Sequence, residues 1–92
     1  MFRPGLPYRC APSVALRPEP FGALAYDFTT RRLSFLKSLE LVEVVRSLEH
    51  HTDVHAALDA AAIPTERHRP LLAALAALCE AGTIEPRRSV AA

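Results

Sequence analysis

The sequence has little net charge, no long apolar run and no leader-like N-terminus. Its 11 basic and 10 acidic residues leave a formal net charge of +1, whereas proteins that bind nucleic acid through counterion release carry a larger positive surplus. The longest apolar stretch, Leu71–Cys79, has nine residues, far short of the ~20 that cross a bilayer. The first residues hold no apolar run of signal-peptide length. We therefore expect a cytoplasmic protein that binds neither membranes nor nucleic acid.

The sequence is also poor in groups that could react or hold a metal. Cys10 and Cys79 fall in different predicted elements and form no C-x-x-C motif, so both a disulfide and two reduced thiols stay open. His51 and His55 are four residues apart, but a predicted helix break separates them and no third ligand follows at a suitable spacing. The three glycines are isolated, which excludes Gly-rich phosphate loops. These patterns predict that the protein is not an enzyme and has no catalytic residues and no bound metal.

What the sequence does contain indicates one small α+β domain over residues 1–92. Half of the residues are apolar, a normal share for a globular fold, and the length suits a single domain. Sixteen alanines and thirteen leucines favour helices. Every aromatic residue precedes Ser38, so the strands are expected before this position and the helices after it.

Three strands are predicted in the N-terminal part, after an extended arm at residues 1–7. The first is Tyr8–Arg17, interrupted or bounded by Pro12 and Pro18. The second, Gly22–Phe28, alternates cleanly, and the third is Arg32–Leu36. The short connections predict an antiparallel meander. In the second strand one face carries Leu24, Tyr26 and Phe28, and the other carries Ala23, Ala25 and Asp27.

Three helices follow in the C-terminal part. Ser38 is the expected N-cap of the first helix, and Thr52 or Asp53 of the second, which Pro64 ends. The third helix starts near Thr65 or near Arg69 and ends before Gly82, the expected C′ residue. A short last strand at 83–87 and a loose tail at 88–92 complete the prediction, a winged-helix-like sheet of three strands followed by three helices.

This order of elements also occurs in DNA-binding winged helices, so a DNA-binding regulator is the alternative function. A recognition helix presents Arg, Lys, Asn or Gln to the base edges. The third helix instead offers Leu, Ala, Cys and Glu80, and its basic residues Arg67 and Arg69 lie at or before its start. The residues therefore favour another mode of binding.

The prolines indicate that mode. Pro12, Pro18 and Pro20 surround the first strand and remove donors that an incoming strand would use. Arg32–Leu36 is then the Pro-free edge of the meander, where a peptide can be added as a further strand. Small side chains on the third helix would allow the peptide to approach closely, although alanines are also simply good helix formers: Ala73, Ala74, Ala77 and Ala81.

An ordered series of segments resembles the PqqD-like peptide chaperones, also called RiPP recognition elements. The segments are Val14-Ala-Leu-Arg-Pro-Glu19, Gly22-Ala-Leu-Ala-Tyr-Asp27 and Leu33-Ser-Phe-Leu-Lys-Ser38, followed by a short Leu/Val helix. Within that family the chain is most similar to the chaperones of the mycofactocin system. The resemblance covers about residues 7 to 86.

The resemblance implies a non-catalytic, cofactor-free peptide chaperone. It would bind the mycofactocin precursor peptide as an added strand between the third strand and the third helix. It would then present the peptide to a radical SAM maturase, which carries iron–sulfur clusters and modifies the C-terminal Val-Tyr end of the peptide. The peptide-binding residues expected on this basis are Arg32, Leu33, Ser34, Phe35, Leu36, Arg67, Leu71, Ala74, Leu75 and Leu78. Arg32 and Arg67 would meet acidic groups of the peptide.

Overall fold

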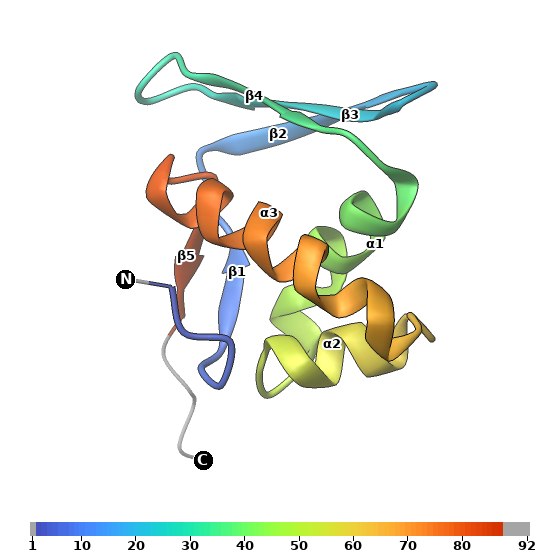
Figure 1. Cartoon of the computed structure of the whole chain (residues 1–92). Helices are drawn as coiled ribbons and strands as arrows, with labels where there is room; N and C mark the ends of the chain where they lie inside the picture. The colour runs from blue at the N-terminus through green and yellow to red at the C-terminus, as the bar shows by residue number, and fades with distance from the viewer. Residues whose placement is uncertain (1, 88–92) are drawn as a thin grey trace.

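The computed structural model describes residues 2–87 and has a sheet of three strands on one side and three helices on the other (Figure 1). A second, two-stranded sheet lies beside the helices. In chain order the elements are β1 (Tyr8–Cys10), β2 (Val14–Glu19), β3 (Gly22–Asp27), β4 (Leu33–Leu36), α1 (Leu39–Ser47), the 3₁₀ turn η1 (Leu48–His50), α2 (Val54–Ala60), the 3₁₀ turn η2 (Thr65–Arg67), α3 (His68–Glu80) and β5 (Ile84–Pro86).

The larger sheet has the predicted topology. Its strand order is β2-β3-β4, and both pairs are antiparallel. Together with the three helices, this confirms the expected α+β class. The final strand is also present as β5, within the predicted range 83–87. The tail at 88–92 lies outside the described residues.

Two features near the N-terminus differ from the sequence prediction. The single strand expected at Tyr8–Arg17 is divided, because β1 pairs with β5 and β2 pairs with β3 in the other sheet. The division falls at Pro12, inside a turn in which the Val14 N–H donates to the Ala11 carbonyl oxygen at 2.9 Å. Residues 4–6 form a turn in place of an extended arm, and the Pro4 carbonyl oxygen accepts from the Val54 N–H at 2.9 Å.

The helix ends follow the expected capping rules. Ser38 caps α1 by accepting from the Leu41 N–H, and Asp53 caps α2 by accepting from the Ala56 N–H. For the third helix, η2 begins at Thr65 and continues directly into α3 at His68. Pro70 is tolerated there because the first-turn N–H groups have no partner within a helix.

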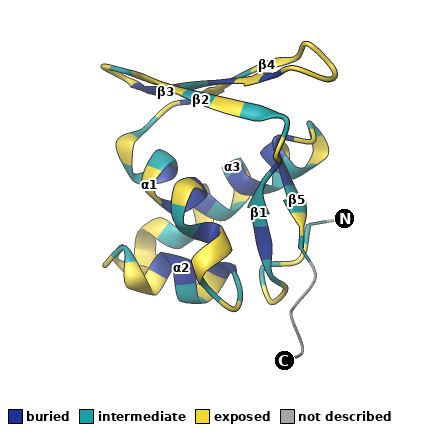
Figure 2. Cartoon of the chain, turned by 180° about the vertical axis from the view of Figure 1, so that it is seen from behind, coloured by how far each residue is buried: buried dark blue, intermediate teal, exposed yellow. Residues whose placement is uncertain are grey.

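The core combines buried residues of both sheets and of all three helices (Figure 2). Alternation along β3 turns Ala23 and Ala25 inward, where they are almost fully buried, so the larger side chains of β3 lie on the outer face. The helices contribute most of the larger buried side chains, including Val44, Leu58 and Leu75.

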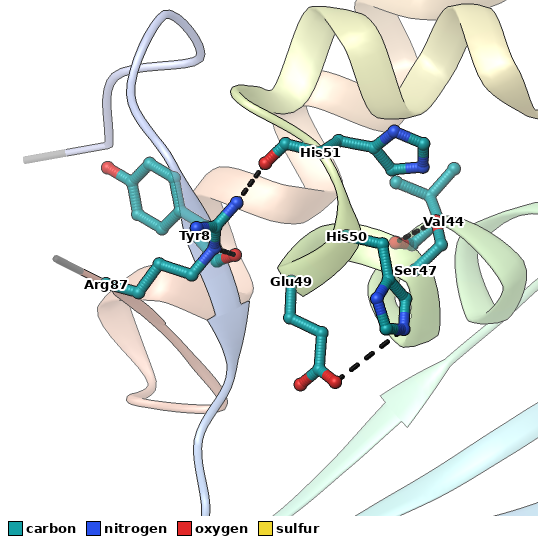
Figure 3. A network of polar contacts seen from close by, with 7 residues as sticks. All are labelled: Tyr8, Val44, Ser47, Glu49, His50, His51 and Arg87. Atoms are coloured by element: carbon teal, nitrogen blue, oxygen red, sulfur yellow. Dashed lines mark hydrogen bonds and ion pairs between the residues drawn. The ribbon is translucent and has the colours of Figure 1, made fainter. Parts of the chain in front are cut away.

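Arg87 ties the two-stranded sheet to the helices (Figure 3). Its Nε donates to the Tyr8 carbonyl oxygen at 3.1 Å, and its Nη2 donates to the carbonyl oxygen of His51. The Arg87 N–H also donates to the Pro7 carbonyl oxygen at 3.1 Å. One side chain therefore joins the end of β5 to β1 and to the segment before α2.

Asp27 organises the loop between β3 and β4. Its Oδ1 accepts from the backbone N–H of Thr29 at 2.9 Å and of Thr30 at 3.3 Å. Burial alone raises the pKa of the Asp27 carboxyl, but hydrogen bonds from Thr29, Ser13 and Thr30 outweigh it and hold the pKa below its ordinary value. The ionised carboxylate is the form that holds this loop.

This lowered pKa makes the stability of the fold sensitive to acid. The pKa of Asp27 is lower in the folded protein than in the unfolded chain. The stabilisation by the Asp27 carboxylate is therefore complete above about pH 5 and is lost as the pH falls through the folded pKa. We expect the free energy of unfolding of Asp27→Asn to fall less than that of the wild type between about pH 6 and about pH 3. Urea titrations at both pH values measure the difference. If the free energy of unfolding falls by the same amount in the variant and the wild type, Asp27 does not have this role.

Candidate functional site

The edge of the larger sheet at β4 has main-chain groups that no neighbouring strand uses. The Asp27 N–H donates to the Arg32 carbonyl oxygen at 2.9 Å, which fixes the alternation of hydrogen bonds along the β3–β4 pair. With Ala25 opposite Ser34 and Ala23 opposite Leu36, the main-chain groups of Ser34 and Leu36 face β3. Those of Leu33 and Phe35 point away from the sheet.

The hydrogen bonds between β2 and β3 lead to the same conclusion about which main-chain groups of β4 are free. The Phe28 N–H donates to the Ser13 carbonyl oxygen at 2.9 Å, and the register continues with Tyr26 opposite Ala15. The even-numbered residues of β3 therefore face β2, which leaves the odd-numbered ones for β4. Of the four expected peptide-binding residues in β4, which are Leu33, Ser34, Phe35 and Leu36, only Leu33 and Phe35 have their main-chain groups on the free edge.

A groove runs along one flank of α3, beside the end of β4 and the start of α1. It consists of two neighbouring hollows of about 290 and 280 Å³, which share Lys37, Leu41 and Ala74 as lining residues. The first also has Ser38, Glu40, Glu66, Arg67, Pro70 and Leu71 in its wall, and the second has Phe35, Ala77 and Leu78. The exposed edge and the groove therefore meet at Phe35, which lines the second hollow and has its main-chain groups on the free edge. Its side chain lies on the outer face of the sheet, on the same side as that of Leu33.

The expected peptide-binding residues in and just before α3 fall into two groups. Arg67, Leu71, Ala74 and Leu78 line the groove, and Leu71 and Leu78 also belong to the core. Leu75 is 0% exposed and lines neither hollow, because its side chain points to the centre of the helical layer. Of the four alanines considered for the helix surface, Ala74 and Ala77 line the groove and Ala73 and Ala81 do not.

The expected strand residues are spread over both faces of the sheet. Leu36 is fully buried, and the Ser34 hydroxyl accepts from the Thr83 hydroxyl at 3.3 Å, which connects β4 to the segment after α3. Leu33 is exposed on the outer face, and Arg32 is exposed in the preceding loop. Lys37 and Leu41 are groove residues that the sequence reasoning missed. The alternation of β4 would not have found Lys37, because it places this residue on the outer face with Leu33 and Phe35.

An ion pair lies at one end of the groove. The Arg67 guanidinium donates to the Glu40 carboxylate, so this cation already has a partner in the chain. Both side chains remain partly exposed, at 57% and 35%, and such pairs contribute little to stability. An acidic group of a ligand would therefore have to compete with Glu40 for Arg67, whereas Arg32 has no such pairing among the ion pairs of residues 2–87.

The exposed face of α3 differs from that of a helix that reads DNA. Its exposed residues are Arg69, Pro70, Ala73, Ala77 and Glu80, so one cation and one carboxylate stand among small apolar groups. The side chains that recognise base edges are Arg, Lys, Asn and Gln. This surface is suited to contact with an apolar chain.

The titratable groups of the fold show no arrangement for nucleophilic chemistry in the part described. Burial, followed by the carboxylates of Glu49 and Glu85, raises the pKa of the Cys10 thiol, which keeps it protonated and unreactive at neutral pH. Cys10 and Cys79 are both free. Across residues 2–87 no three His, Cys, Asp or Glu side chains are grouped so as to hold a metal ion. None of the helices in this range is long and apolar enough to cross a membrane.

Comparisons with known proteins agree with a peptide-binding role. The model of the "Peptide chaperone MftB family" matches residues 7–85. A peptide chaperone MftB from Mycolicibacterium smegmatis is 47% identical over 85 residues, which cover 92% of this chain and 83% of that protein. Those from Mycobacterium ulcerans and Mycobacterium tuberculosis are 46% and 41% identical, and each alignment covers 96% of this chain and 81% of the relative. No solved structure gives a significant match.

All three relatives are named as peptide chaperones, which bind a peptide without changing it chemically. This non-catalytic role confirms the prediction that the protein is not an enzyme. With the family model matched over most of its length, the chain belongs to the peptide chaperone MftB family.

Proposed function

We propose that this protein binds the mycofactocin precursor peptide as a fourth strand beside β4 and delivers it to a radical SAM maturase. The observation that carries the proposal is the free edge at Leu33 and Phe35, because their main-chain groups lie next to an apolar groove. An added strand obtains affinity from main-chain hydrogen bonds and specificity from pockets for alternate side chains. Here β4 would supply the main-chain hydrogen bonds, and the groove along α3 would supply the pocket for side chains.

The two sides of a bound strand would meet different surfaces. Side chains on its inner side would lie over the groove, where Ala74 and Ala77 leave room for them. Side chains on its outer side would lie beside those of Leu33 and Phe35. Both of these residues are 54% exposed and can cover an apolar neighbour.

The edge alone is too short to explain tight binding. Leu33 and Phe35 offer four main-chain groups, and each hydrogen bond contributes about 1 kcal/mol net. Micromolar affinity corresponds to about 8 kcal/mol, so side chains in the groove must contribute at least as much as the main chain. The lining of Leu41, Ala74 and Leu78 supplies the apolar surface for this.

Filling the groove tests the proposal. Calorimetry with the precursor peptide is expected to give micromolar or tighter binding to the wild type, and NMR is expected to show shifts of the Leu33 and Phe35 amides. Ala77→Trp fills the groove and is expected to weaken binding at least about tenfold, or 1.4 kcal/mol. Ala73→Trp is the matched control, since Ala73 is also an exposed alanine of α3 but lines neither hollow.

Two results would count against the proposal. Absence of binding by calorimetry, with the maturase both present and absent, would overturn the precursor as ligand. Equal affinities of Ala77→Trp and Ala73→Trp would show that the peptide binds outside the groove. For delivery, the maturase is expected to modify the precursor faster with the chaperone present than without it.

A further inference from the structure

The outer face of the larger sheet, which turns away from the helices, is covered with apolar side chains. Phe21, Phe28 and Phe35 are 47%, 65% and 54% exposed, and Tyr26 and Leu33 are 37% and 54% exposed. The alternation that buries Ala23, Ala25 and Leu36 brings these larger groups to the outside. Isolated exposed apolar residues are common on proteins, so the arrangement of these residues matters more than their number.

These side chains form one continuous patch, called the outer patch below. The register places Leu24 opposite Phe35 and Tyr26 opposite Leu33. The rings of Phe21 and Phe35 lie edge to face with centroids 6.2 Å apart, and those of Tyr26 and Phe28 are 5.1 Å apart. A hollow of about 550 Å³ lies within the patch, lined by Phe21, Leu24, Leu33, Phe35 and Lys37.

The outer patch is large for a protein of this size. A large aromatic side chain presents on the order of 200 Å² when fully exposed, so the observed fractions amount to about 500 Å² of exposed apolar surface. Patches beyond a few hundred Å² mark interaction sites, and one side of a standard protein–protein interface buries about 800 Å². The patch can therefore form the apolar centre of such an interface.

Cations border the patch. Arg17 lies opposite Leu24 on the same face, Lys37 lines the hollow, and Arg31 and Arg32 are exposed in the loop between β3 and β4. The nearby carboxylates are Glu19, which pairs with Arg17 at 3.2 Å, and Asp27, which is buried on the other face. A second copy of the chain would bring another positive border against this one. A partner whose apolar surface is bordered by carboxylates complements it.

The shape of the patch favours a folded protein over a bilayer. A hollow in an apolar patch accepts a protruding side chain, the usual anchor of a protein interface, whereas a lipid surface has no such projection. The patch is also continuous with the proposed peptide edge, since Leu33 and Phe35 contribute their main chain to the edge and their side chains to the patch. A strand added at β4 would extend the same face, so a protein docked there would touch the bound peptide.

We propose that the outer patch is a second docking surface, occupied by a folded protein with an apolar surface bordered by carboxylates. The identification of this protein as the maturase that receives the peptide rests on the proposed function. The chaperone would then hold the peptide by an edge and the enzyme by the adjoining face. Peptide and enzyme would bind at the same time.

Phe28→Glu tests this surface. Phe28 lies at the end of β3 that leads into the loop and does not line the groove or the peptide edge, so the substitution places a carboxylate on the patch without changing the peptide site. Thr29→Glu is the control, with the same change in charge at the next exposed position. Phe28→Glu is expected to weaken binding to the maturase at least about tenfold and Thr29→Glu less than about threefold. Calorimetry is expected to show unchanged affinity for the precursor in both.

The outcomes separate the two proposals. A wild type that does not bind the maturase, or a Phe28→Glu variant that binds it as the wild type does, overturns the docking surface. If the wild type does not bind the precursor but still binds the maturase in a way that depends on Phe28, the proposed function is overturned and the docking surface is not.

Light scattering that shows a wild-type dimer and a monomeric Phe28→Glu would assign the patch to a second copy. Phe28-dependent sedimentation with phosphatidylglycerol vesicles would assign it to a membrane.

Discussion

Leu33→Pro is expected to weaken binding of the precursor peptide about tenfold, while Leu33→Ala weakens it less than about threefold. Leu33 is the first residue of β4, and its N–H points to the free edge. Proline removes that donor and places its ring where the added strand must lie. Alanine removes the side chain and keeps the donor, so the difference between the two variants reports the main-chain contact alone.

The fold is expected to survive Leu33→Pro, because proline is tolerated at the first residue of an edge strand. Ser34→Pro is expected to show the opposite behaviour, because the Ser34 N–H faces β3 and its loss would disrupt the sheet. Calorimetry with the peptide and thermal unfolding of all three variants measure both effects. If Leu33→Pro and Leu33→Ala lose the same affinity, the peptide uses the side chain and not the edge.

Gly22→Ala is expected to destabilise the protein by about 3 kcal/mol or more and to lower the Tm by more than about 10 °C. A Cβ at Gly22 would lie 2.0 Å from the Leu36 carbonyl oxygen and 3.0 Å from the Ser38 nitrogen. Both contacts are with backbone atoms, which no rotamer change can move away. The φ of +150° at Gly22 adds strain for any other residue. The start of β3 would separate from the segment that connects β4 to α1.

The other two glycines provide graded controls. Gly82 has a φ of +82° at the end of α3 but nothing within 4 Å of a Cβ, so Gly82→Ala is expected to cost about 1 kcal/mol. Gly5 also has open space around it, and Gly5→Ala is expected to be close to neutral. Urea unfolding ranks the three variants. If Gly22→Ala lowers the free energy of unfolding no more than Gly82→Ala does, the close approach of Gly22 to the backbone of Leu36 and Ser38 is contradicted.

Local sequence signals predicted most of the fold. Alternation in the predicted strand Gly22–Phe28 identified the two faces of β3. Ser38, Gly82 and the pair Thr52 and Asp53, of which Asp53 is the cap, marked helix ends through chemistry that acts within a few residues. The division of Tyr8–Arg17 could not be predicted in this way. It depends on β5, more than 60 residues farther along the chain, and the same run of residues is compatible with one strand or two.

The candidate site was predictable only in part, for a similar reason. The absence of proline identified β4 as an edge, and the structure places it there. Which residues direct their main-chain groups outward depends on the register with β3, and a shift of one residue would exchange Ser34 for Phe35. The burial of Leu75 and the position of Ala77 in the groove depend on how α3 is rotated, which the helical repeat alone does not determine.

The pairing of β1 with β5 brings the two ends of the described chain together, with Tyr8 opposite Pro86 and Cys10 opposite Ile84. Both ends leave from the same end of this antiparallel pair, near the ion pair between Arg9 and Glu85 at 2.7 Å. A mechanical load between the ends therefore acts on one hydrogen-bonded pair at a time, as in unzipping, and never on all of them in shear. The protein should yield at low force when pulled by its ends, with β1 and β5 separating before the sheet that carries β4.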